Sequence, residues 1–137
     1  MRSHPVLSGR HRWNRTLGKA AEVVDAGAVE VFSPMDAARD SEAVLMSLAD
    51  DRASRDVMAR LAGLGSDPDA PIVADMSTVS PATSRELRDA APGGRFVAAP
   101  VVGGPPVVLR GQAMGLLGGR RDLVNRLDRS PILSVCL

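Results

Sequence analysis

The sequence predicts an α/β fold with a doubly wound, mainly parallel sheet. Short apolar runs alternate with segments of helical periodicity along most of the chain, the order typical of repeated β-α units. The 137 residues suit one domain with one core. An apolar share of 45% and a charged share of 24% match a globular protein that folds in water.

The first part of the chain is expected to contain three strands, each followed by a helix. The strands are expected at 12–14, 28–32 and 42–48, and the helices at 16–28, after Ser33 and at 51–65. In the first helix, one apolar face is expected from Leu17, Ala20, Ala21 and Val24. Gly27 is expected to end this helix in a left-handed conformation.

Two of these helices carry recognisable start signals. Ser33 precedes Pro34, which suits the first helical position, and Asp36 falls in the first turn. Asp50 and Asp51 are expected at the start of the following helix, because the helix dipole favours carboxylates there.

The second part of the chain is expected to continue the alternation. Strands are expected at 71–76, 95–102 and 112–119, and helices at 80–91 and 120–129. Ser80 is expected to cap the helix that opens with Pro81. The segment "GLGSDP" (63–68) is expected to be a helix-ending loop, because it follows a helix and lacks the third glycine of a phosphate-binding loop.

Composition excludes several function classes. Seventeen basic and sixteen acidic side chains give a net charge of +1, and no basic cluster is interleaved with aromatics, so nucleic acid is not an expected partner. Cys136 is the only cysteine, and His4 and His11 lack partners at metal-ligand spacing, so no metal site is expected. With no membrane-spanning run and no leader peptide, a cytoplasmic location is expected.

Three motifs in register resemble one enzyme family. The segments "WNRT" (13–16), "DMSTVSPATSREL" (75–87) and "APVVGGP" (99–105) resemble the cofactor domain of the β-hydroxyacid dehydrogenase family, in its 3-hydroxyisobutyrate dehydrogenase branch. Imine reductases and 6-phosphogluconate dehydrogenase are more distant relatives. The resemblance implies a Rossmann-like sheet, with an incomplete dinucleotide-binding domain at 12–137 and an irregular segment at 1–11.

The resemblance implies a set of cofactor contacts. Asn14, Arg15 and Thr16 match the positions that favour the 2′-phosphate of NADP, since a guanidinium offers a planar fork to phosphate. NADP is therefore expected, with NAD as the alternative cofactor. Without the neighbouring motifs, the residues alone favour the interpretation of Arg15 as a solvated side chain at a helix start, with Thr16 as its cap.

Further contacts are implied on the reacting side of the cofactor and for the substrate. Leu48, Ser77 and Thr78 are expected beside the nicotinamide. Val102, Gly103 and Gly104 match a segment that binds the carboxylate of a small hydroxy acid in relatives, through a hydroxyl and backbone amides. Here Val102 stands in place of the serine, so the hydroxyl is lost. Ser80 is expected to be a helix cap rather than a ligand contact.

The resemblance breaks at both ends of the chain. Relatives begin with an apolar strand and a GxGxxG loop, and residues 1–11 contain neither. That strand normally lies between those expected at 12–14 and 42–48, so two open edges and self-association through them are expected. Residues 5–7 are a candidate to fill the gap in part.

Catalytic residues are not expected in this chain. Relatives carry a catalytic lysine in a further helical domain, whereas Lys19 is the only lysine here and belongs to the helix after "WNRT". Because hydride transfer also needs a proton-accepting group, the chain is expected to be inactive alone. The first hypothesis is therefore a truncated NADP-binding domain of an oxidoreductase. The alternative is a non-catalytic interaction domain derived from the same fold.

A phosphorylation receiver domain is a third interpretation. Asp50 and Asp51 follow an apolar strand, as acidic residues do in such domains, but the lysine that this site also requires after a later strand is missing. Asp50 and Asp51 are therefore interpreted as helix-start carboxylates.

Overall fold

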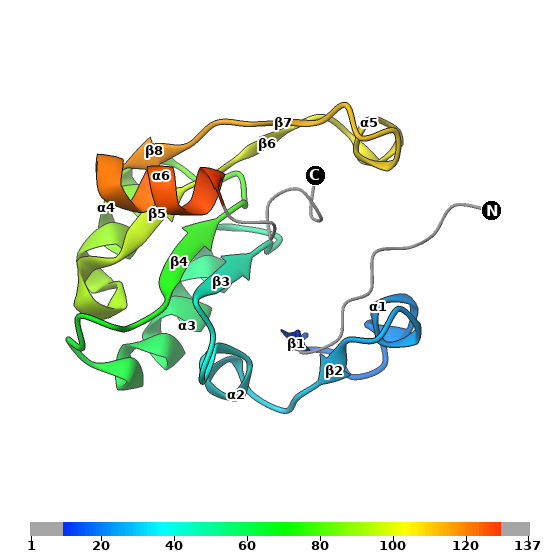
Figure 1. The fold of residues 1–137 in the computed structure, drawn as a ribbon, viewed down its shortest axis with the longest axis horizontal. Helices are drawn as coiled ribbons and strands as arrows, with labels where there is room; N and C mark the ends of the chain where they lie inside the picture. The colour runs from blue at the N-terminus through cyan, green and yellow to red at the C-terminus, as the bar shows by residue number, and fades with distance from the viewer. Residues whose placement is uncertain (1–9, 130–137) are drawn as a thin grey trace.

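The central sheet has four strands, three of them parallel (Figure 1). The computed structural model describes residues 10–129. Strands β3 (Ala43–Met46), β4 (Ile72–Asp75), β5 (Phe96–Ala98) and β8 (Gly118–Gly119) lie in the order β3-β4-β5-β8. Only β8 runs antiparallel to its neighbour. The predicted mainly parallel α/β sheet is confirmed.

Helices cover both faces of this sheet. On one face, α3 (Asp51–Leu61) and α4 (Pro81–Ala90) pack through an apolar cluster. Its buried members from these elements and from the strands include Val57, Met58, Leu61, Leu87, Val73 and Phe96. On the other face, α6 (Arg121–Asp128) packs through a second cluster with Ile72, Ala74, Val97, Leu123 and Leu127. Successive residues of β4 thus join opposite clusters, as expected of a strand buried on both faces.

The helix starts on the first face follow the predicted chemistry. The carboxylate of Asp50 accepts a hydrogen bond from the amide of Ala53 at 2.8 Å. The hydroxyl of Ser80 accepts one from the amide of Thr83 at 3.2 Å, and Pro81 occupies the first helical position. These caps satisfy amides that have no partner inside the helix. The predictions for Asp50 and Ser80 are confirmed.

A smaller two-stranded sheet lies to one side. It consists of β1 (His11–Arg12) and β2 (Val29–Glu30), which are parallel and joined through α1 (Ala21–Asp25). Helix α2 (Pro34–Ala38), capped by Ser33, connects it to β3. Figure 1 shows this unit set apart from β3. Within residues 10–129, neither β1 nor β3 has a strand on its second edge, so the predicted open edges are present.

The helix predicted at 16–28 is much shorter in the structure. It begins at Ala21, its N-cap is Ala20 without a side-chain hydrogen bond, and Thr16 does not cap it. Gly18 has a φ of +83°, which interrupts any helix at this point. Of the expected apolar face only Ala20 is buried, since Leu17 is 63% exposed and Ala21 and Val24 are also exposed. Gly27, with a φ of +101°, follows the helix end in the left-handed region as predicted.

The strands predicted at 95–102 and 112–119 are each divided in two. After β5, the chain forms β6 (Val101–Val102), and the second segment forms β7 (Met114–Gly115) and β8. Strand β6 pairs antiparallel with β7 in a separate hairpin. Pro100, which has no amide to donate, lies at the break, and its carbonyl accepts from Leu116 at 3.0 Å.

Three short helical segments accompany the main helices, and only the one at 62–64 lies within a predicted helix, that at 51–65. Helix α5 (Pro105–Leu109) occupies the end of the β6–β7 arm, between the segments where strands were predicted at 95–102 and 112–119 (Figure 1). The turns η1 (Ala62–Leu64) and η2 (Pro92–Gly94) end α3 and α4. Gly65, with a φ of +69°, follows η1, so the prediction of a helix-ending loop at 63–68 is confirmed.

Some sequence predictions concern residues that the structure does not describe. Residues 5–7, His4 and Cys136 lie outside the described residues. Among the helices of residues 10–129, none has the length and apolar character needed to cross a membrane.

Candidate functional site

The carboxyl ends of β3 and β4 are joined by a side-chain hydrogen bond. The two strands run parallel with Met46 opposite Asp75. Just beyond this pair, the hydroxyl of Ser77 accepts a hydrogen bond from the amide of Leu48 at 2.9 Å. Ser77 is buried at 6% exposure, whereas Thr78 is exposed. The structure therefore brings Leu48 and Ser77 together and leaves the neighbouring Thr78 exposed.

A buried carboxyl group lies beneath this junction. Asp75 is 2% exposed, and its Oδ1 accepts a hydrogen bond from the amide of Ser77 at 3.0 Å. Its Oδ2 has no hydrogen-bond partner among the described residues. Burial raises the pKa of Asp75, and the nearby charge of Asp51 adds to the rise, while the hydrogen bonds from Ser77 oppose it. The neutral acid is thus favoured more than in water.

Sequence reasoning missed Asp75 as a site residue. The signal was an acidic residue at the end of an otherwise apolar strand, where a side chain that alternates toward the core must be buried. Its position fixes the Ser77 amide, and Ser77 in turn fixes the Leu48 amide. The three residues form a chain of contacts across two strand ends.

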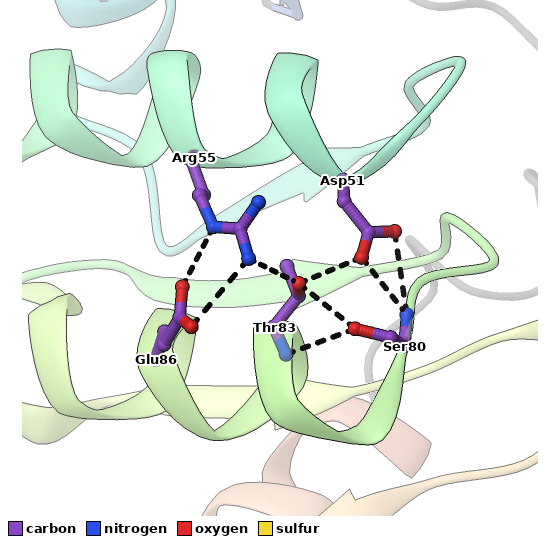
Figure 2. A network of polar contacts seen from close by, with 5 residues as sticks. All are labelled: Asp51, Arg55, Ser80, Thr83 and Glu86. Atoms are coloured by element: carbon purple, nitrogen blue, oxygen red, sulfur yellow. Dashed lines mark hydrogen bonds and ion pairs between the residues drawn. The ribbon is translucent and has the colours of Figure 1, made fainter.

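A polar network ties the starts of α3 and α4 together (Figure 2). Thr83 is fully buried, and its hydroxyl donates to Asp51 at 2.7 Å and accepts from Arg55 at 2.8 Å. Arg55 also pairs with Glu86 at 2.6 Å. The Ser80 amide donates to both oxygens of Asp51 at 3.3 and 3.4 Å. These contacts hold the two helix starts in a fixed relation below the loops of the site.

The same network lowers the pKa of Asp51. The hydroxyl of Thr83 is the main donor to this carboxylate, followed by Ser80, and both lower the pKa of Asp51. The sequence had placed Asp51 at a helix start but gave no sign of Thr83, Arg55 or Glu86 as its neighbours. Hydrogen bonds between two helices depend on how the helices pack, which periodicity does not reveal.

The residues expected at the adenosine end follow β1. The side chain of Asn14 accepts a hydrogen bond from the Thr16 amide at 3.0 Å, which closes a tight turn. Arg15, at the tip of this turn, is exposed. Within the described chain, no hydrogen bond joins this turn to the Leu48 and Ser77 loops. The two groups of predicted residues thus lie on separate sheets.

The predicted substrate segment begins the β6–β7 arm. Val102 is 54% exposed and offers no hydroxyl. Gly103 has a φ of +137°, and a Cβ atom there would lie 3.0 Å from the Val107 side chain, so glycine is required. Gly104 precedes α5, whose first residues, Pro105 and Pro106, have no amide hydrogen. Amide donors in this segment therefore come from the glycines themselves.

The hollow in the described structure and the single lysine lie away from the strand ends at Leu48 and Ser77. A hollow of about 440 Å³ lies between the ends of α3 and α4, lined in part by Gly65, Ser66 and Pro92. It is therefore at the amino ends of the strands, away from Ser77. Within residues 10–129, no group of three His, Cys, Asp or Glu side chains is placed to hold a metal ion. Lys19 is exposed and precedes α1.

Comparison with known proteins identifies relatives of the chain. A family model described as the NAD binding domain of 6-phosphogluconate dehydrogenase matches residues 10–135. Glyoxylate/succinic semialdehyde reductase 1 of Arabidopsis thaliana is 34% identical over 114 residues, which are 81% of this chain and 39% of that protein.

Solved structures of oxidoreductases share the fold of this chain. Psf3 in complex with NADP+ and 2-OPP is 26% identical with a TM-score of 0.72, covering 92% of this chain and 45% of its own. The 3-hydroxyisobutyrate dehydrogenase of Mycobacterium tuberculosis shares the fold, with a TM-score of 0.76 at 19% identity over 90% of this chain and 42% of its own. The chain spans about two fifths of the length of the curated relative. From its fold, its motifs and the extent of the family match, the chain belongs to the β-hydroxyacid dehydrogenase family, as part of the NAD-binding domain that its members share with 6-phosphogluconate dehydrogenase.

Proposed function

We propose that this chain binds NADP as the cofactor domain of an oxidoreductase similar to 3-hydroxyisobutyrate dehydrogenase. The observation that carries the proposal is the bond between Leu48 and Ser77 at the carboxyl ends of adjacent parallel strands. Doubly wound sheets bind their ligands outside these strand ends. The family match supports a dinucleotide ligand over a purely protein-binding role.

The nicotinamide end of the cofactor is assigned to the Leu48 and Ser77 loops. Ser77 uses its hydroxyl to hold the Leu48 amide, so its part is to shape the loop. The exposed hydroxyl of Thr78 is free to contact the carboxamide of the ring. A bound nicotinamide supplies the hydride, and these residues orient the ring that carries it.

The choice of NADP over NAD rests on Arg15. The Asn14 side chain holds the turn in which Arg15 is exposed, so the guanidinium is available to a phosphate. Arginine binds phosphate through two parallel hydrogen bonds, which an unphosphorylated ribose does not offer. Thr16 adds a hydroxyl beside it.

The pyrophosphate is the part of the cofactor that the described residues fit least. Within residues 10–129, no GxGxxG sequence follows a strand and opens a helix. We therefore propose a modest affinity of the isolated chain for the dinucleotide, arising from contacts at the two ends of the molecule.

The substrate proposed is a small hydroxy acid held near Val102, Gly103 and Gly104. Backbone amides of the two glycines would bind its carboxylate, without the hydroxyl that Val102 replaces. We further propose that the isolated chain does not catalyse hydride transfer. Lys19 is its only lysine and lies in the turn before α1, rather than at the Ser77 strand end.

Titration of the purified chain with NADPH and with NADH tests the cofactor assignment. Quenching or enhancement of nicotinamide fluorescence gives the dissociation constants. We expect saturable binding of NADPH, tighter than that of NADH. Binding of neither cofactor at millimolar concentration would contradict the proposal, and tighter binding of NADH would contradict the part assigned to Arg15. Thr78→Val serves as the variant at the nicotinamide end, because it removes only an exposed hydroxyl.

A further inference from the structure

A buried carboxyl group ends the strand beside the loops that we assign to the nicotinamide. Asp75 is the last residue of β4, and Ser77, two positions later, holds the Leu48 amide. Asp75 is 2% exposed, and its Oδ1 accepts a hydrogen bond from the Ser77 amide at 3.0 Å. A charge on this carboxyl group therefore acts on the Ser77 loop at close range.

Asp75 faces the side of the sheet that α3 and α4 cover. Val73 belongs to the apolar cluster under these helices, whereas Ile72 and Ala74 belong to the α6 cluster. Because side chains alternate along a strand, Asp75 lies on the same face as Val73. Its Oδ2 is buried and has no hydrogen-bond partner among residues 10–129. Since a buried carboxylate needs donors at both oxygens, its surroundings satisfy only half of the ionised group.

The charge that acts most on Asp75 comes from Asp51 at the start of α3. This carboxylate disfavours a second negative charge nearby, and burial of Asp75 works in the same direction. Asp50, also at this helix start, is engaged as the cap of α3. Arg55 of α3 and Glu86 of α4 pair with each other, and the residues of β3 and β5 opposite Asp75 are uncharged. No cation among these groups neutralises an ionised Asp75.

The two redox forms of a nicotinamide differ by one charge. The oxidised ring is cationic, whereas the reduced ring, which carries the hydride, is neutral. A cation nearby favours the ionised form of a carboxyl group, and a neutral neighbour leaves burial as the main influence. A ring held beside Ser77 and Thr78 therefore favours a different protonation state of Asp75 in each redox form.

We propose that Asp75 is a specificity-determining residue that distinguishes the oxidised from the reduced cofactor. Asp75 is ionised when the cationic form is bound, and its proton passes to the solvent. Asp75 keeps its proton when the neutral form is bound. Binding of NADP+ to the chain with neutral Asp75 thus yields the complex with ionised Asp75 and one proton in solution. The inference rests on the proposed function, because it places the nicotinamide at the Leu48 and Ser77 loops.

The inference gives the pH dependence of cofactor binding a definite sign. Burial raises the pKa of Asp75, so the group ionises above about 3.9, its ordinary value. As the pH rises through the raised pKa, Asp75 in the free chain loses its proton, and binding of NADP+ no longer requires that loss. Binding of NADP+ therefore strengthens as the pH rises, whereas binding of NADPH gains nothing from the ionisation of Asp75.

Calorimetric titration of the full chain with NADP+ between about pH 4 and 8 tests the inference. The wild type is compared with Asp75→Asn, which keeps an oxygen for the Ser77 amide but cannot ionise. The comparison cancels the titration of groups on the cofactor itself. We expect the affinity of the wild type for NADP+, relative to the variant, to rise about three- to tenfold with pH. With freshly mixed NADPH, this ratio should not rise.

Proton release provides a second measurement. Calorimetry in buffers of different ionisation enthalpy counts the protons released on binding. We expect the wild type to release more protons than Asp75→Asn with NADP+, and the two chains to release equal numbers with NADPH. Asp89→Asn is the matched control, because Asp89 is an exposed aspartate beside the hollow at the amino ends of the strands. This variant should behave as the wild type.

Carboxyl titration of Asp75 by NMR needs no substitution. In the free chain its pKa should lie above the ordinary value, and saturating NADP+ should lower it. An ordinary pKa in the free chain, or a pKa that bound NADP+ leaves unchanged, would overturn the inference.

The outcomes separate the inference from the proposed function. Binding of NADP+ with the same pH dependence in the wild type and in Asp75→Asn contradicts the inference and supports the proposed function. Binding of neither redox form at millimolar concentration contradicts both. Stronger binding of NADP+ at higher pH in the wild type, but not in Asp75→Asn, supports both.

Discussion

The amide of Leu48 donates a hydrogen bond to the hydroxyl of Ser77 at 2.9 Å, joining the loops that follow β3 and β4. The bond spans 29 positions of sequence. It fixes the spacing of two strand ends at the edge of the sheet where a doubly wound fold binds its ligand. The first prediction concerns this contact.

Replacing Ser77 by alanine should loosen both loops. The Leu48 amide loses its acceptor in a half-buried setting, so we expect the free energy of unfolding to fall by about 1–2 kcal/mol. NADPH binding should weaken as well, because the loop that we propose to face the nicotinamide is no longer held. Urea unfolding and NADPH titration measure the two effects. Ser47→Ala, at an exposed neighbouring serine, is the control and should change neither.

Asp75→Asn should stabilise the protein in a pH-dependent way. Burial raises the pKa of Asp75 in the folded state, so its stabilising contribution is complete below the unfolded pKa, about 3.9, and is lost as the pH rises through the folded pKa. Asparagine keeps an oxygen for the Ser77 amide but never ionises. The variant should therefore gain stability over the wild type as the pH rises from about 3 to 7.

Urea unfolding at several pH values checks the Asp75 prediction. Because Asp51 contributes to the raised pKa, the same series on Asp51→Asn shows how much of the effect comes from its charge. A stability difference between Asp75→Asn and the wild type that stays constant across this pH range would contradict the prediction.

Thr83→Val should break the network between α3 and α4. Valine fills a similar volume but loses the hydrogen bonds to Asp51 and Arg55, so we expect a loss of about 1–3 kcal/mol in the free energy of unfolding. The pKa of Asp51 should rise toward its ordinary value. Asp51 carries a lowered folded pKa, so its contribution is present above about 3.9 and is lost as the pH falls through the folded pKa.

Carboxyl titration of Asp51 by NMR, in the wild type and in Thr83→Val, measures that pKa directly. Thr78→Val is the matched control, since this threonine is exposed and outside the network. An unchanged titration of Asp51 in Thr83→Val would mean that the hydroxyl of Thr83 does not set its charge.

Arg15→Ser should change the preference between cofactors. Loss of a charged hydrogen-bond donor to the 2′-phosphate costs about 1.5–3 kcal/mol, which corresponds to roughly ten- to hundredfold weaker NADPH binding. NADH binding should stay within about twofold, because NADH has no such phosphate. Calorimetric titration with both cofactors measures the ratio. Arg88→Ser, at an exposed arginine of α4, should leave both affinities unchanged.

Gly103→Ala should strain the start of the β6–β7 arm. A φ of +137° is unfavourable for alanine, and its Cβ would meet Val107 at 3.0 Å, so we expect a cost of about 1–3 kcal/mol in the free energy of unfolding. Gly104→Ala is the matched control, because that position has an ordinary φ of −76° and its nearest neighbour is 3.8 Å away. Equal thermal stability of the two variants would contradict the prediction.

The sequence predicted local structure correctly where one chemical reason dominated. Apolar residues occupy both alternating sets of positions in the run at 71–76, and the strand within this run, Ile72–Asp75, is buried on both faces. Ser80 before Pro81 marked a helix start, because a side-chain oxygen and a proline both suit the first turn. The sequence predicted one strand at 95–102, because its side chains favour the extended backbone. The structure has two shorter strands there, because Pro100 has no amide with which to continue the hydrogen-bond ladder of the sheet.

The sequence by itself determined the family and the alternation of the main strands and helices. These follow from periodicity and from motifs in register. Only the tertiary structure decided that Ser77 holds Leu48, that Asp75 is buried with one oxygen unpaired among residues 10–129, and that Thr83 links Asp51 to Arg55. Each of these depends on which residues of separate elements lie opposite one another, and that register is set by packing rather than by any local run of residues.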